Sequence, residues 1–144
     1  YIMDNDVNEI LNLLEEQTSS SIIKLNSNKI MEHKNNILQQ IQITGPQLKT
    51  FHKKLKEYRY CSDMRDFVEG NYVRWIPLKD PSKIYLTNGG ILVNVEIFES
   101  GVQIRVKNNQ NRFFNIKFDE VLIFQKLSMQ EKIIIKVLDL IDKS

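Results

Sequence analysis

The chain has 144 residues, of which 20 are basic and 18 acidic, so its formal net charge is only +2. This length suits one domain with at most an appendage, and so small a charge does not by itself favour nucleic acid as the partner. Hydrophobic residues make up 42% of the chain, which is enough for a core. The single cysteine, Cys61, excludes a disulfide framework and a cysteine-based metal site, and it is typical of an intracellular protein.

The sequence supports three further expectations. No apolar run approaches the ~18 residues of a membrane span, so we expect no transmembrane helix. The chain has 19 Ile, 15 Lys and 14 Asn but no Ala, which favours an AT-rich genome as its source. It starts at Tyr1 without a signal-peptide pattern, so we expect a processed or truncated chain in the cytoplasm or nucleus.

Helical periodicity dominates residues 1–69, where we predict about three helices. The first two cover residues 5–17 and about 28–42. The third is predicted to start at Gly45-Pro46, because proline suits the first helical turn, and to extend to about Gly70. Its apolar residues have heptad spacing and form a candidate association stripe, which consists of Leu48, Phe51, Leu55 and Tyr58.

From residue 70 the apolar period changes from 3.6 to 2, which is typical of strands. We predict strands over residues 71–78, 83–87, 91–98, 102–107, 112–118 and 121–126. The predicted strand over residues 112–118 carries Phe114, Ile116 and Phe118 on one face. Short strands joined by tight, glycine- and asparagine-rich turns favour a small SH3-like or OB-like barrel or rolled sheet.

The chain ends in the clearest amphipathic pattern. Ser128 and Glu131 have capping-box spacing, and apolar residues then recur at 134, 137, 138 and 141. We expect this helix to plug or flank the sheet. The fold class is therefore α+β, with a helical region at 1–69 and a small β module with a C-terminal helix at 70–144, which is expected to fold as a unit.

Catalytic patterns are missing from the sequence. His33 and His52 lie among polar and lysine neighbours on predicted helices, which is typical of solvated histidines. Spacings typical of zinc ligands do not occur. The glycine-rich residues 87–90 lack the lysine and the following helix of a phosphate loop.

The remaining reactive or acidic residues have simpler interpretations. Asp63 with Asp66, or Asp119 with Glu120, could contribute to a magnesium site, but surface charges are the simpler interpretation. Cys61 between two tyrosines could be a low-pKa thiolate, yet a free buried cysteine is the simpler interpretation here too. We therefore predict no enzyme, no metal and no cofactor.

Binding is the remaining class of function. Strand alternation puts basic and aromatic side chains on the outer face of the β part, where cations can bind phosphate and rings can stack on bases. The candidate surface for nucleic acid or a protein partner consists of Tyr72, Arg74, Arg105, Lys107, Phe113 and Lys117. A solvated sheet exterior protected by charges is the competing interpretation.

Residues 70–76 (GNYVRWI), 86–90 (LTNGG) and 112–127 resemble uncharacterised proteins of nucleocytoplasmic large DNA viruses, and residues 113–120 (FFNIKFDE) are the most distinctive part. The resemblance covers the C-terminal half and does not extend to the N-terminal helices. It implies a viral origin and a role in the virion or the virus factory, and it brings no catalytic motif.

Two functions follow. We favour a non-enzymatic structural or protein-interaction protein, because the charge is nearly neutral and the helical half has more apolar positions than three short helices bury alone. A protein partner or self-association is then expected. The alternative is a nucleic-acid-binding module that uses the basic and aromatic exterior of the β half.

Overall fold

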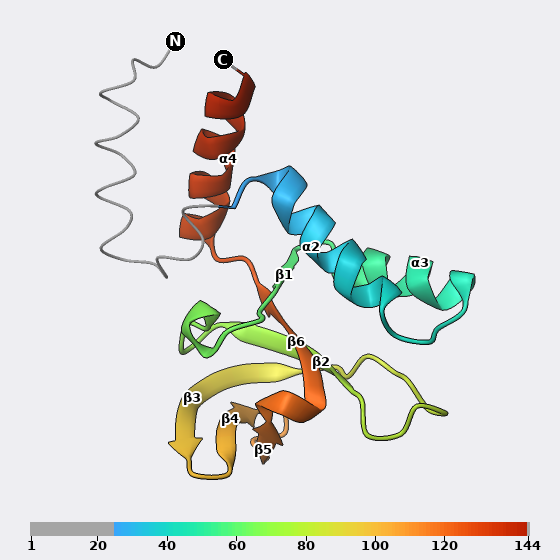
Figure 1. The fold of residues 1–144 in the computed structure, drawn as a ribbon. Coiled ribbons are helices and arrows are strands. Elements are labelled where there is room, and N and C mark those ends of the chain that lie inside the picture. Colours follow the sequence, from blue (N-terminus) through green and yellow to red (C-terminus); the bar gives the residue numbers. More distant parts are fainter. Residues whose placement is uncertain (1–24, 144) are drawn as a thin grey trace.

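The computed structural model describes residues 25–143 and shows three α-helices and a six-stranded antiparallel sheet in that range (Figure 1). This confirms the α+β class, while the helix predicted over 5–17 lies outside the described residues. The helices are α2 (Ser27–Gln39), α3 (Gly45–Lys54) and α4 (Met129–Lys143). The strands are β1 (Tyr58–Tyr60), β2 (Tyr72–Pro77), β3 (Gly90–Phe98), β4 (Gly101–Lys107), β5 (Phe113–Lys117) and β6 (Val121–Lys126). Two short 3₁₀ helices are η2 (Met64–Asp66) and η3 (Phe118–Glu120).

The sheet has the strand order β1-β6-β2-β3-β4-β5 and is not closed into a barrel. The predicted barrel is therefore wrong, because β5 pairs only with β4 and β1 pairs only with β6, so no ladder joins the two edge strands. The curled arrangement of β3, β4 and β5 is visible in Figure 1. Five of the six predicted strands occur close to their expected bounds.

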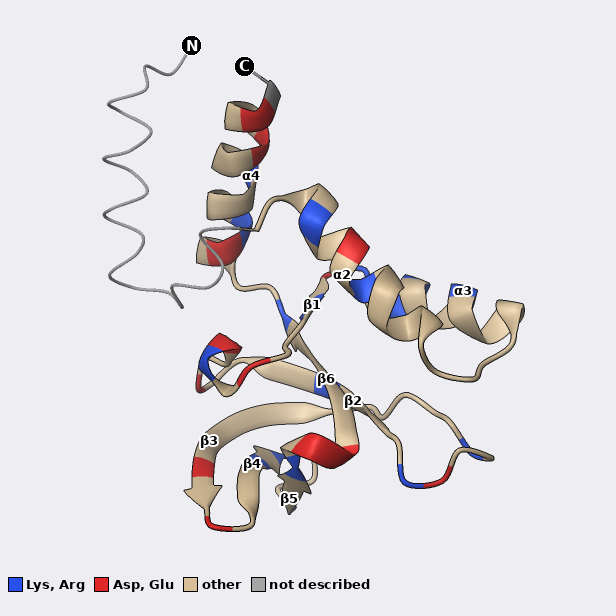
Figure 2. Ribbon diagram, in the orientation of Figure 1, with Lys and Arg blue, Asp and Glu red and all other residues tan. Residues whose placement is uncertain are grey.

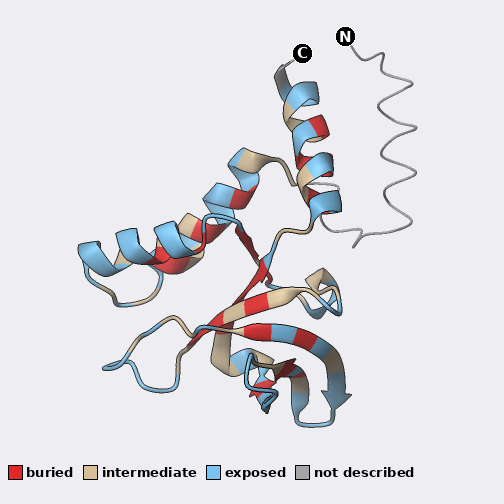
Figure 3. Ribbon diagram, turned by 180° about the vertical axis from the view of Figure 1, so that it is seen from behind, coloured by how far each residue is buried: buried red, intermediate tan, exposed pale blue. Residues whose placement is uncertain are grey.

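The two faces of the sheet bury different cores. On one face, the helix face, residues of β1, β2 and β6 pack under α2 and α3 in a cluster that consists of Leu38, Phe51, Leu55, Tyr58, Ile76, Leu122 and Phe124. On the other, the inner face, the curled sheet encloses Val73, Trp75, Leu92, Ile104, Val106, Ile116 and Ile123. Figure 3 shows these buried segments in red along the strands.

The helix face continues onto β3, β4 and β5 without helices over it. Tyr72 pairs with Ile91, Ile91 with Lys107, and Lys107 with Phe113, so these four side chains share one face of the sheet. Ile91 and Phe113 are exposed there. This part of the face, on β4 and β5, is the solvated exterior that the sequence predicted.

The third predicted helix is too long. α3 starts at Gly45 as expected but ends at Lys54, and Tyr58 lies on β1 beside β6. The ammonium of Lys34 donates to the carbonyl oxygen of Leu55 at 2.9 Å and satisfies an acceptor at the helix end. Aromatic residues suit strands, and the edge of β6 was free to pair, so the heptad spacing was misleading beyond Leu55.

Other local predictions fail for similar reasons. Residues 83–87 form no strand, because the N–H of Trp75 donates to the hydroxyl oxygen of Thr87 at 3.1 Å in place of a second ladder. Phe118, predicted on a strand, begins η3 and meets Phe67 edge-on with ring centroids 5.7 Å apart. Phe67 follows η2 and is not helical, so the 64–68 extension of the third helix is also wrong.

The last helix has the predicted start but a different neighbour. The N–H of Glu131 donates to Ser128 Oγ at 3.1 Å and the N–H of Ser128 donates to Glu131 Oε1 at 3.0 Å, which confirms the capping box. α4 then leaves the sheet and lies beside the start of α2 (Figure 1). Ile134 and Ile135 pack with Ile30 of α2, so α4 does not plug the sheet.

Candidate nucleic-acid interface

Strand register brings four of the six predicted surface residues together. Arg105 and Lys107 on β4 lie across from Asn115 and Phe113 on β5, and Lys117 lies across from Gln103, so their side chains share one face. Arg105, Phe113 and Lys117 are exposed and Lys107 is half-buried. We call the surface of Arg105, Lys107, Phe113 and Lys117 the basic face. Figure 2 shows lysine and arginine on these two strands.

Charge is one-sided around the basic face. Residues 101–117 include four basic residues and no acidic one. The guanidinium of Arg105 lies 4.4 Å from the ring centroid of Phe113, which is cation–π distance. Lys117 approaches Glu120 at 4.0 Å, an exposed pair that solvent and salt weaken. A phosphate backbone would therefore meet cations and one exposed ring here.

Tyr72 and Arg74 lie on the same side of the sheet but are held by the loop before β3. The Tyr72 hydroxyl donates to the carbonyl oxygen of Asn88 at 2.7 Å, and Arg74 Nε donates to that of Thr87 at 2.8 Å. Both residues are half-buried. These bonds order the loop, so Arg74 has one fewer donor for an external phosphate than the exposed Arg105.

The predicted association stripe lies mostly in the core. Phe51, Leu55 and Tyr58 are buried against the sheet, and Leu48 is partly buried beside them. Tyr58 belongs to β1, so the four residues do not form one helical seam. These four residues are therefore covered largely by the chain itself, whereas the predicted helix over 5–17 lies outside the described residues.

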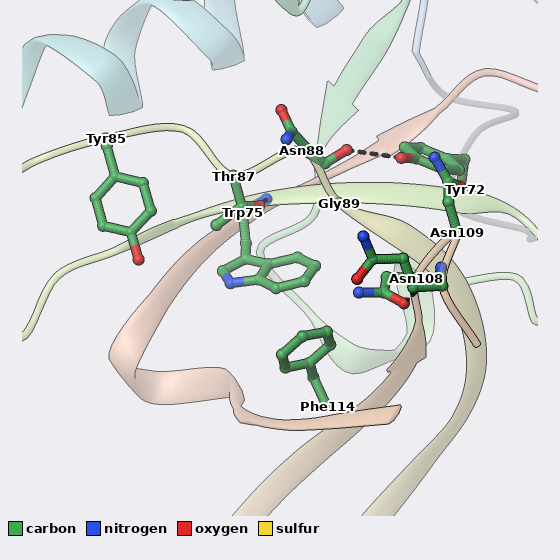
Figure 4. Close-up of a pocket in the computed structure, with 10 residues that line it drawn as sticks. Tyr72, Trp75, Tyr85, Thr87, Asn88, Gly89, Asn108, Asn109 and Phe114 are labelled. Atoms are coloured by element: carbon green, nitrogen blue, oxygen red, sulfur yellow. Dashed lines mark hydrogen bonds between the residues drawn. The ribbon is translucent and has the colours of Figure 1, made fainter. Parts of the chain in front are cut away.

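A pocket that the sequence did not suggest opens beside β2 and β5, at the mouth of the curled sheet (Figure 4). Its volume is about 490 Å³, within the range of small-molecule sites. The lining is aromatic and carboxamide-rich and consists of Tyr72, Trp75, Tyr85, Thr87, Asn88, Gly89, Asn108, Asn109, Gln110 and Phe114. We call it the mouth pocket, and none of these lining residues is charged.

Backbone geometry explains why the mouth pocket forms. Gly89 has φ +83°, and a Cβ there would lie 2.0 Å from the carbonyl oxygen of Val73, so only glycine lets the loop pass this close to β2. On the other side, Asn111 with φ 62° closes the turn between β4 and β5. The asparagine-rich and glycine-rich turns were the available sequence signal, but their proximity depends on the curl of the sheet.

Several of the groups considered for chemistry have partners in the fold, while His33 and Asp119 are exposed. Burial raises the pKa of the Cys61 thiol to about 12, so the thiol stays protonated and is not a nucleophile at neutral pH. Hydrogen bonds from Arg65 lower the pKa of Asp63 to about 2, and Asp66 accepts the N–H of Asp63. His52 Nε2 lies 3.2 Å from Asn35 Oδ1, and burial lowers its pKa. Among residues 25–143, no group of three or more histidine, cysteine or acidic residues could hold a metal ion.

The described helices include none long and apolar enough to cross a membrane. Comparison of the chain with protein-family models, curated proteins and solved structures finds no match. The resemblance to proteins of large DNA viruses therefore stays an expectation.

Proposed function

We propose that this protein binds single-stranded nucleic acid through the basic face. The observation that supports it most is the register that puts Arg105, Lys107 and Lys117 on the same face as the exposed ring of Phe113. Backbone phosphates bind cations, and bases stack on aromatic rings or on guanidinium planes. The sequence alone ranked this function second. We now place it first, because Phe51, Leu55 and Tyr58, three residues of the stripe that favoured association, are buried within the chain.

We also propose an assignment for the fold of the sheet. We describe β2 to β6 as an SH3-like roll, since five antiparallel strands follow in the order β6-β2-β3-β4-β5 with the single turn η3 before the last strand. We propose a binding module without enzymatic activity, because Cys61 is buried and the side chains of Asp63 and His52 have hydrogen-bond partners.

Salt dependence tests the proposal. Three phosphate contacts from Arg105, Lys107 and Lys117 give a log–log slope of affinity against salt of about −2 on single strands. The double variant Arg105→Gln, Lys107→Gln should reduce the magnitude of this slope by about 1.4. A fluorescence-anisotropy titration of a labelled single strand at several salt concentrations measures both values.

The matched control removes the same charge elsewhere. Lys53 and Lys54 are exposed on α3, so the variant Lys53→Gln, Lys54→Gln lowers the net charge equally without touching the basic face. Its salt slope should equal that of the unaltered protein. An equal fall in both double variants would show that only net charge matters, and the proposed interface would be abandoned.

A second candidate is protein interaction, the function that the sequence favoured. The observation for it is the apolar tip of the β3–β4 hairpin, where Ile97 is 69% exposed and Phe98 45% exposed. Native mass measured with and without nuclease treatment separates the two functions. A nuclease-resistant assembly that Ile97→Ser disperses would favour the protein partner.

A further inference from the structure

The mouth pocket opens at the turn that follows Lys107 and adds a second kind of recognition to the basic face, which lies on the other side of the sheet. We propose that it holds one unpaired base of the bound strand, so that the protein recognises an exposed base as well as the backbone. This inference rests on the proposed function, because the basic face supplies the phosphate contacts.

Aromatic rings from three parts of the chain meet in the pocket (Figure 4). Trp75 of β2 and Phe114 of β5 have centroids 6.4 Å apart and planes inclined by 58°. Tyr85 comes from the loop between β2 and β3 and is 47% exposed. Inclined rings leave a corner in which a flat group can stack on one ring and touch the edge of the other.

Unused polar groups favour a ligand with acceptors and donors on its edge. Trp75 lines the pocket and is only 9% exposed, yet its indole N–H is not among the buried side-chain atoms that lack a partner in the described part of the chain. Figure 4 shows the indole nitrogen on the side of the ring turned towards Tyr85. The indole N–H therefore opens to the pocket and is available to an acceptor on a bound ligand, because indole is a donor only.

The carboxamides on the other side of the pocket are suitably placed. Asn108 Oδ1 accepts the N–H groups of Gln110 and Arg112 at 2.9 and 3.0 Å, which fixes the side chain and leaves its amide hydrogens as donors. Asn109 adds a second carboxamide at the rim. A carboxamide can donate to and accept from one base edge at the same time.

Charge distinguishes a nucleotide from other ligands with flat or ring-shaped groups. The pocket lining is neutral, so a phosphate, a metal ion or a charged amino acid would find no opposite charge inside it. The turn that forms its rim is cationic, because Lys107 precedes that turn and Arg112 follows it. A neutral base inside and an anionic backbone outside match this arrangement, whereas an uncharged sugar or proline-rich peptide would use only the inside.

Trp75 is the only tryptophan, so its fluorescence reports directly on the pocket. The full chain is titrated with a short mixed-sequence single strand, an abasic strand of equal length, the same sequence as a duplex, and free adenosine. We expect the base-bearing single strand to quench Trp75. The abasic strand and the duplex should bind in anisotropy without quenching, and adenosine should quench only at much higher concentration.

The titrations with these ligands test the base-binding pocket and the proposed function separately. Salt-dependent binding of the base-bearing strand without quenching would overturn the pocket and leave the proposed function standing. Absence of binding to every strand would overturn both. Quenching by adenosine at lower concentration than by the strand would identify a free nucleoside as the ligand and overturn the inference. Quenching by a proline-rich peptide but by no base-bearing strand would also overturn it.

Two exposed aromatic residues provide matched variants. Tyr85→Ala removes a ring of the pocket, while Phe98→Ala removes an equally exposed ring, 45% against 47%, at the far end of β3. Tyr85→Ala should raise the dissociation constant of the single strand about 5- to 100-fold, because one base stack is lost. The salt slope should stay unchanged, because no phosphate contact is removed. Phe98→Ala should leave the constant unchanged, and equal weakening by both variants would contradict the assignment.

Discussion

At the scale of single residues, the centre of the molecule contains a fully buried ion pair. Arg59 Nε donates to Glu131 Oε2 at 2.9 Å, and both side chains are 1% exposed. The guanidinium also donates to the thiol of Cys61 and to the carbonyl oxygen of Asp66. The pair joins β1 to the first turn of α4, two elements 72 positions apart in the sequence.

Removing one partner of this pair should be costly. Glu131→Gln leaves the charge of Arg59 buried and uncompensated, so we expect the free energy of unfolding to fall by about 3–5 kcal/mol. The matched control is Glu57→Gln, because Glu57 pairs with Lys132 at 3.4 Å on the surface and such pairs contribute about 1 kcal/mol or less. Urea denaturation of both variants measures the difference, and similar losses would mean that burial of the pair has little effect.

At the scale of secondary-structure elements, the entry into β3 depends on two consecutive glycines, because a Cβ on Gly89 would lie 2.0 Å from the carbonyl oxygen of Val73 and one on Gly90 2.5 Å from that of Lys107. Gly89 and Gly70 have similar φ angles, +83° and +90°, but of these two only at Gly89 would a Cβ meet backbone. The turn before β3 is therefore constrained by space as well as by backbone conformation.

Alanine substitutions at Gly70 and Gly89 should separate the cost of the positive φ angle from the cost of the steric clash. Gly70→Ala should cost about 1–2 kcal/mol, the strain of a positive φ angle. Gly89→Ala should cost clearly more, because the loop must also move away from Val73 and disturb the mouth pocket. Thermal unfolding compares the variants. Equal losses would show that the loop shifts freely and that the close approach has no energetic importance.

At the scale of the whole molecule, several contacts join residues on the two sides of the boundary predicted at residue 70. β1 pairs with β6, α2 packs on α4, and the Arg59–Glu131 pair joins the two sides. The division into 1–69 and 70–144 stays a prediction from sequence, and these contacts lead to a different expectation for the isolated fragment.

A fragment of residues 70–144 should not unfold cooperatively. It would lose β1 and expose Phe124 and Ile134, each of which contributes about 1.5–3 kcal/mol when fully buried. A fragment of residues 25–144 retains these contacts and serves as the control. Calorimetry of both fragments measures cooperativity, and a sharp transition in the shorter one would restore the boundary at residue 70.

The sequence determined the features that depend on neighbouring residues. The capping box of Ser128 and Glu131, the turn at Asn88-Gly89-Gly90 and the alternation that puts Arg105 and Lys107 on one face all follow from local backbone geometry. Five strands were predicted for the same reason, because the alternation of side chains repeats every two residues. The sequence could therefore group Arg105 with Lys107 and Phe113 with Lys117, whereas the register between β4 and β5 decided that all four share one face.

Only the tertiary structure decided what depends on distant partners. Tyr58 has helical spacing, yet it pairs with β6 because that edge was free; α4 is amphipathic, yet its partner is α2. The mouth pocket gathers side chains from β2, β5, a loop and a turn, so no local pattern could predict it. Periodicity specifies which face of an element is apolar, whereas sheet curl and strand order determine what that face contacts.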